Sequence, residues 1–153
     1  MKNHRAILKA VSAVLLACTA GFAAAADSQT LAVTATVSGI CKFSVASTPL
    51  AFGTIDPSLS TDKVVTANVL YKCTKGTASA GVTATGGTSR TMAGPSSDTM
   101  SYTLGFSGDT STGTGFGSGQ DLTLVVTGTI TAANYQNKTA GAYSENVTLN
   151  ITP

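Results

Sequence analysis

The chain has 153 residues, of which only 10% are charged, and nine Lys and Arg against seven Asp and Glu give a formal net charge of +2. Three of the basic residues fall within the first nine positions, so the rest of the chain carries a net charge of −1 and offers no basic patch for nucleic acid. Scarce charge with abundant Gly, Ser, Thr and Ala suits a protein of short strands and polar loops better than an enzyme with a charged cleft.

The N-terminal residues 1–26 have the composition of a cleavable export signal. Basic residues precede a short apolar stretch, and small residues up to Ala26 predict cleavage before Asp27. The apolar stretch is too short for a membrane-spanning helix, so no integral membrane segment is expected. Removing 26 residues leaves 127, enough for one domain with its own core. An alternative stays open, because residues 15–18 resemble a bacterial lipobox in which Cys18 would become the acylated first residue.

The first predicted strand, residues 30–37, alternates apolar and hydroxyl side chains. One face of it would carry Leu31, Val33, Ala35 and Val37. A strand at the mature N-terminus is free to pair outside its own domain, but an ordinary first strand has the same alternation. We therefore expect an N-terminal extension over residues 27–38 and a domain over residues 39–153, with the extension's partner left open.

Further strand patterns recur along the domain with turn residues between them and no convincing amphipathic helix. Strands are predicted at residues 41–45, 49–55, 63–73, 79–85, 100–106, 122–130 and 145–152. Residues 63–73 give the clearest alternation, and residues 122–130 form a continuous β-branched run typical of a central strand. Residues 107–120 are a Gly/Ser/Thr-rich loop. Several short strands with frequent turns predict an all-β fold, a β-sandwich.

Two cysteines remain once the signal is removed, Cys41 and Cys73. An even pair in an exported protein predicts a disulfide, and both side chains have the inward phase of their strands. Closing a loop of about 33 residues stabilises a fold by about 3–4 kcal/mol on the chain-entropy model. Two free buried thiols are the alternative.

The chain has few residues that could support catalysis or bind a metal ion. Its one histidine, His4, lies in the signal segment, and Glu145 is its one glutamate. The aspartates are scattered among turn residues, where their side chains commonly hydrogen-bond the local main chain. We therefore expect no enzyme, no cofactor and no metal site.

A set of short motifs occurs in a characteristic order along the domain. They are Cys41-x-Phe43, Leu50-Ala51-Phe52-Gly53, Tyr71-Lys72-Cys73-Thr74, Gly86-Gly87, Arg90-Thr91-Met92, Met100-Ser101-Tyr102-Thr103-Leu104, and Gly141-Ala142-Tyr143-Ser144-Glu145-Asn146-Val147. Together they resemble the spore coat protein U domain family, which includes the pilins of the archaic chaperone–usher pathway.

The resemblance implies an immunoglobulin-like β-sandwich that lacks its last strand. It implies that a periplasmic chaperone first lends a strand, and that at the outer-membrane usher the N-terminal extension of another subunit replaces it. Residues 27–38 would then be the donor segment, with Leu31, Val33, Ala35 and Val37 facing the groove. The expected product is a homopolymer of like subunits, a surface fibre or a spore or cyst coat reached through the periplasm, with a role in adhesion or biofilm.

A second class of function is compatible with the same sequence. A monomeric secreted β-sandwich could bind a ligand such as a glycan. Carbohydrate-binding surfaces usually carry exposed aromatic side chains, whereas this chain has no Trp and several of its Tyr and Phe fall at inward positions. The sequence therefore favours the polymer subunit over the binding module.

Overall fold

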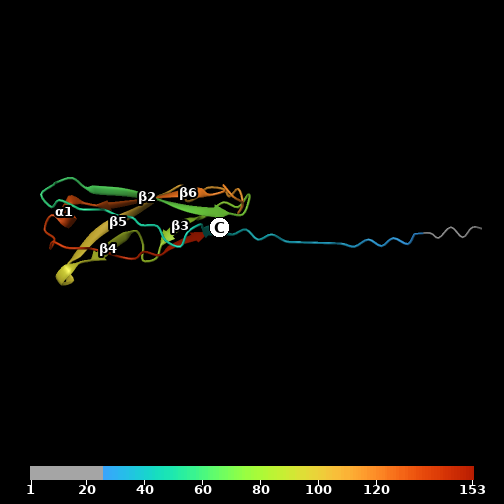
Figure 1. Cartoon of the computed structure of the whole chain (residues 1–153), viewed down its shortest axis with the longest axis horizontal. Coiled ribbons are helices and arrows are strands. Elements are labelled where there is room, and N and C mark those ends of the chain that lie inside the picture. The colour runs from blue at the N-terminus through green and yellow to red at the C-terminus, as the bar shows by residue number, and fades with distance from the viewer. Residues whose placement is uncertain (1–25) are drawn as a thin grey trace, which may run out of the picture. The chain divides into compact units, whose positions relative to one another are not determined.

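The computed structural model of this protein describes residues 26–153 (Figure 1). The predicted signal segment, apart from Ala26, and the alternative lipidation site Cys18 lie outside the described residues. The chain divides into Met1–Ala35 and a compact unit, Thr36–Pro153. Within the first part, residues 26–35 are exposed and form no strand.

Five strands of the compact unit form one antiparallel sheet. In spatial order they are β1 (Cys41–Phe43), β2 (Lys63–Cys73), β6 (Leu122–Ile130), β5 (Thr99–Ser107) and β4 (Ser89–Ala93). The β-branched β6 is the central strand, as predicted, because it pairs with β2 on one side and β5 on the other. The predicted inward residues of β2 and β5 are buried or half-buried, while the intervening positions are largely exposed.

A second sheet pairs β3 (Gly81–Ala84) with β7 (Leu149–Thr152). Val82 and Ala84 of β3 belong to the same buried cluster as Leu124 and Val126 of β6, so the two sheets enclose one core. The predicted all-β sandwich is therefore confirmed. No helix within residues 26–153 is long and apolar enough to cross a membrane.

Besides residues 30–37, which form no strand, two predicted strands are wrong wholly or in part. Residues 49–55 form no strand, although Leu50, Phe52 and Ile55 are half-buried and pack against the core. Of the strand predicted at residues 145–152, only Leu149–Thr152 is a strand. Both segments have the alternating burial of a strand, because an extended chain lying on a core buries every second side chain whether or not another strand pairs with it.

Other elements differ in their bounds or were not predicted. Strand β4 was missed because Arg90, a charged residue, takes an inward position and breaks the apolar alternation. A one-turn helix α1 (Ala132–Tyr135) and a 3-10 turn (Pro95–Ser97) connect strands. Strand β1 ends at Phe43 rather than at residue 45, and β3 is shorter than the predicted 79–85.

The predicted disulfide joins the first strand of the domain to its longest strand. Cys41 and Cys73 are directly opposite in the β1–β2 register and are bonded, with their Cα atoms 4.1 Å apart. Just before β1, the hydroxyl of Thr74 accepts a hydrogen bond from the N–H of Ile40 at 3.1 Å and donates one to the carbonyl of Ser38 at 3.0 Å. Residues 38–41 are therefore fixed to the end of β2, so the C-terminal end of the extension is attached to the domain by an ordered segment.

Candidate strand-binding groove

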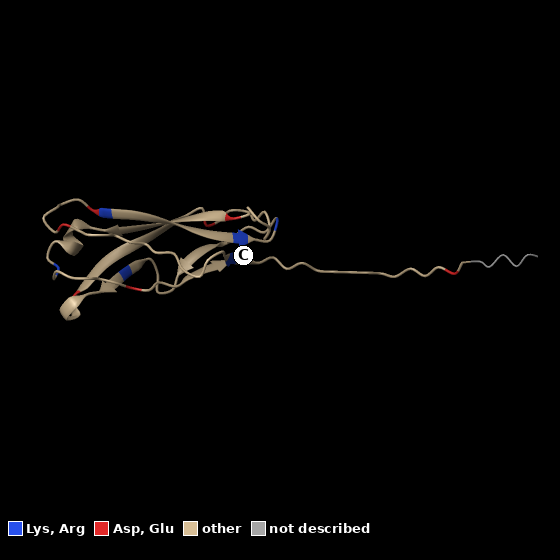
Figure 2. Ribbon diagram, in the orientation of Figure 1, with Lys and Arg blue, Asp and Glu red and all other residues tan. Residues whose placement is uncertain are grey.

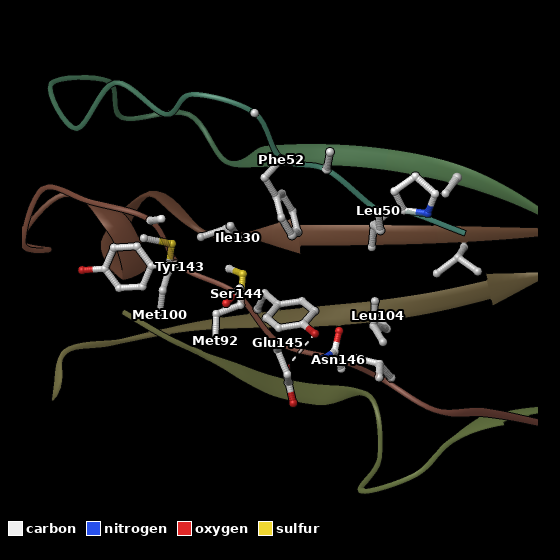
Figure 3. Close-up of a pocket in the computed structure, with 18 of the residues that line it drawn as sticks. Leu50, Phe52, Met92, Met100, Leu104, Ile130, Tyr143, Ser144, Glu145 and Asn146 are labelled. Carbon is white, nitrogen blue, oxygen red and sulfur yellow. Dashed lines mark hydrogen bonds between the residues drawn. The ribbon is translucent and has the colours of Figure 1, made fainter. Parts of the chain in front are cut away.

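A long groove runs over the inner face of the five-stranded sheet (Figure 3). Its volume is about 1170 Å³. Two segments that form no strand for most of their length border it, residues 45–55 on one side and residues 138–149 on the other. We refer to them as the 45–55 wall and the 138–149 wall.

The floor of the groove is apolar. It consists of inward side chains of the five-stranded sheet: Ala67, Val69, Met92, Met100, Tyr102, Leu104, Val126 and Ile130. The charged residues that line the groove are Lys138 and Glu145, and each has an oppositely charged partner. The groove therefore presents an apolar, electrically balanced surface.

The 45–55 wall rests on a glycine of the central strand. A Cβ atom at Gly128 would lie 2.8 Å from Cδ2 of Leu50 and 2.8 Å from Cζ of Phe52, closer than packed carbon atoms approach. The absence of a side chain at Gly128 lets both residues reach the sheet. The Phe52 ring also packs edge-on against Tyr102, with ring centroids 5.8 Å apart.

The 138–149 wall has one main-chain edge directed to the rest of the fold and one directed to the groove. Ser144 and Ala93 exchange two main-chain hydrogen bonds, of 3.0 and 3.1 Å, and the carbonyl of Thr148 accepts one of 2.9 Å from Thr85. Successive residues of an extended chain direct their main-chain groups to opposite sides. The main-chain groups of Glu145 and Val147 therefore point to the groove side, where a further strand could pair with them.

A polar cluster holds this wall to the floor. Glu145 forms an ion pair with Arg90 of β4 and accepts a hydrogen bond of 2.8 Å from the hydroxyl of Tyr102 of β5. Burial, together with the hydrogen bond to Glu145, raises the pKa of Tyr102 to about 12, so its hydroxyl stays a donor. The hydrogen bond that Arg90 donates to the Glu145 carboxylate also raises the pKa of Arg90. In Figure 3, Glu145 lies near the middle of the groove.

A second anchor lies at the start of the same wall. Asp98 accepts hydrogen bonds from the N–H of Thr139 at 2.9 Å, from the hydroxyl of Tyr143 at 3.0 Å and from Nζ of Lys138 at 3.2 Å. The main-chain donors of Thr139 and Thr99 lower the pKa of Asp98 well below its usual range. One carboxylate thus fixes three residues of the wall.

The predicted donor residues lie apart from this groove in the sequence and are exposed. The side chains of Leu31, Val33 and Val37 are 83%, 82% and 81% exposed, and Ala35 is exposed as well. Exposed large apolar side chains at alternate positions are unusual in a protein that functions as a monomer. Among residues 26–153, no three His, Cys, Asp or Glu side chains gather as they would around a metal ion.

Sequence reasoning missed the polar cluster of Arg90, Tyr102 and Glu145. The three residues belong to separate motifs, and the sequence does not show that these motifs meet. A signal was available, because Glu145 is the one glutamate of the chain and lies at an inward position of an otherwise apolar alternation.

Comparison with known families identifies the domain. A model of the Spore Coat Protein U domain matches residues 27–150. The chain belongs to the Spore Coat Protein U domain family. The resemblance drawn from the motifs is therefore confirmed. No protein of curated function and no solved structure matches the chain significantly.

Membership places this Spore Coat Protein U domain among structural subunits of surface coats and pilus-type assemblies. Such a subunit needs a surface that binds its neighbours rather than a catalytic centre. The groove, with its apolar floor and the main-chain groups of Glu145 and Val147 directed into it, is the feature of this fold best suited to that task.

Proposed function

We propose that this protein is a subunit of a bacterial surface fibre, or of a spore or cyst coat, that polymerises by donating its N-terminal segment. Residues 27–38 of one copy would lie in the groove of another copy as an additional strand. The domain is on this view an incomplete sandwich, and a second copy of the same chain completes it. The observation that carries the proposal is the groove itself, a hollow with an apolar floor between two walls that form no strand for most of their length.

The N-terminal segment has the properties that the groove requires of its occupant. Between Asp27 and Lys42 the chain carries no charged residue (Figure 2), which suits a groove whose charges are already paired. Four apolar side chains at alternate positions match a floor that is apolar along its length. The Thr side chains between them would face away from the floor.

The groove of such a subunit must be covered before the donor segment of the next subunit binds. An unfilled groove leaves the groove-directed main-chain groups of its wall without partners, so the free domain would self-associate. We propose that a periplasmic chaperone covers the groove first and that an outer-membrane usher exchanges it for the next subunit. Export would use residues 1–26 as a cleaved signal, and the finished polymer would act at the cell surface, in adhesion or biofilm.

Deletion of residues 27–39 tests the donor role. The shortened subunit keeps the groove, so it should still be recovered in complex with its chaperone when the two are co-expressed. It lacks the donor strand, so electron microscopy of cells and of reconstituted samples should show no fibres of this subunit alone. Fibres of normal length from the shortened subunit would overturn the proposal.

A second experiment distinguishes the polymer subunit from a monomeric binding module. Size-exclusion chromatography of the full mature chain, made without any chaperone, should show aggregates or oligomers. A stable, soluble monomer under those conditions would contradict the open groove and favour the ligand-binding alternative.

A further inference from the structure

We infer the register of the donor strand: Ala35 of one copy lies over Tyr102 of the next, and the strand runs antiparallel to the 138–149 wall. This rests on the proposed function and specifies how its two surfaces meet. In this arrangement Leu31, Val33, Ala35 and Val37 lie opposite Leu149, Val147, Glu145 and Tyr143, respectively.

The position of Ala35 follows from a series of side-chain contacts that crosses the groove from one wall to the other. The Phe52 ring of the 45–55 wall packs on Tyr102 with centroids 5.8 Å apart and an angle of 73° between the rings. The Tyr102 hydroxyl then reaches Glu145 of the opposite wall at 2.8 Å. These three side chains fill the floor from wall to wall, so only a small side chain fits above them, and Ala35 is the smallest of the four donor residues.

The main-chain pattern agrees with this position. Between Tyr143 and Leu149, the groove-directed main-chain groups of the wall belong to the odd-numbered residues, whose side chains are also half-buried. In an antiparallel pair, directly opposite residues place their side chains on the same face. Pairing Ala35 with Glu145 therefore puts all four apolar donor residues over the floor and leaves Thr34 and Thr36 outside.

The direction of the strand follows from the two ends of the domain. One end of the groove lies by Phe43 and Leu149, near Ile40 and the C-terminal end of the domain's own extension at residue 38. The other end lies by Met100, Ile130 and Tyr143 (Figure 3). The β2–β6 register separates Ile130, opposite Lys63, from the Cys73 end of β2 by ten residues, about 33 Å of strand.

A linear polymer needs the donor to leave the groove at the end away from the host's own extension. With the antiparallel direction, Val37 lies toward Met100, and the donor's domain follows beyond that end. The reverse direction would bring the donor's domain to the end where the host's extension begins, and the two would crowd one another. Antiparallel insertion therefore gives head-to-tail growth.

Interchain disulfide formation tests the register. Thr34 and Asn146 are directly opposite in it, both are exposed, and they form a non-hydrogen-bonded pair with Cα atoms about 4.5 Å apart, within reach of a disulfide. One mature chain carries Thr34→Cys and a second, differently tagged chain carries Asn146→Cys. The two are co-assembled, mildly oxidised and separated by non-reducing electrophoresis.

Two matched pairs act as controls, Thr34→Cys with Ser144→Cys and Thr34→Cys with Thr148→Cys. Each shifts the pairing by two residues and uses an exposed site on the same wall. We expect at least about fivefold more cross-linked dimer from the Asn146 pair, because register is strongly specified when one face is buried. More product from either control, or none from any pair in normally formed fibres, overturns the register while the donor role stands. If the unmodified chains do not assemble at all, the proposed function itself fails.

A size test provides a second measurement. When full-length mature chains assemble into fibres, Ala35→Leu should slow assembly by about tenfold or more. The space above the Tyr102 ring has no room for the added carbon atoms. Val33→Leu adds a single methylene opposite Val147, away from Tyr102, and should change the assembly rate by less than about threefold. The opposite order would show that another donor residue lies over Tyr102.

Discussion

Tyr102 and Glu145 are 43 residues apart in the sequence, yet the Tyr102 hydroxyl donates a 2.8 Å hydrogen bond to Oε2 of Glu145. This bond ties the floor of the groove to a wall that forms no strand at that point. The same Tyr102 ring supports Phe52 of the other wall. A single side chain therefore contributes to the spacing of the two walls before any partner strand is present.

Replacing Tyr102 with Phe should lower the free energy of unfolding by about 1–2 kcal/mol, because it removes a hydrogen bond to a charged group and leaves Glu145 one donor short. The ring would still pack against Phe52. Urea unfolding of the mature protein, followed by circular dichroism, measures the loss. Tyr102→Leu also removes the ring contact and should be less stable than Tyr102→Phe. Equal stability of wild type and Tyr102→Phe would mean that the bond does not hold the wall.

Replacing Val33 with Asp should block fibre formation and leave the folding of the parent domain unchanged. The side chain is 82% exposed in the free chain, whereas in the groove its carboxylate would be buried without a partner. Electron microscopy measures fibres, and circular dichroism checks the fold. Thr34→Asp places the same charge on the opposite side of the strand and should be far better tolerated. Equal loss of fibres from both variants would show that residues 30–37 are not a one-faced donor strand.

The acid stability of the groove should depend on Asp98. Hydrogen bonds from Thr139 and Thr99 lower its pKa in the folded protein below the ordinary value of 3.8. The stabilisation is therefore fully present above that ordinary value and is lost as the pH falls through the lowered one. Urea midpoints measured from pH 5 downward should fall more steeply for wild type than for Asp98→Asn. Asp27→Asn removes a charge outside the compact unit and should leave the wild-type profile unchanged; parallel profiles for all three would exclude this role of Asp98.

Titration of the mature protein under denaturing conditions should find no free thiol, because Cys41 and Cys73 are bonded. Replacing both with Ser should lower the free energy of unfolding by about 3–4 kcal/mol on the chain-entropy model. The single variants should lose at least as much, since each leaves one thiol free to form mixed disulfides. Two free thiols in protein expressed in the periplasm would contradict the bond.

The residue patterns were sufficient to predict the features that depend on local alternation. The inward faces of β2 and β5, the central place of β6 and the Cys41–Cys73 pair follow from side-chain period, β-branched composition and cysteine number. These properties are encoded within a few neighbouring residues, so they can be predicted without knowing what lies alongside. The family resemblance rested on the order of such local motifs.

Only the tertiary structure decided which extended segments are paired strands and which are groove walls. Residues 49–55 and 145–148 alternate as a strand does, but pairing depends on whether another strand lies beside them, and that is not a property of their own sequence. The meeting of Arg90, Tyr102 and Glu145 is likewise set by strand order and register. A charged residue at an inward position is unfavourable until folding brings its partner from another strand, and this is why the cluster that shapes the groove was not evident from the sequence.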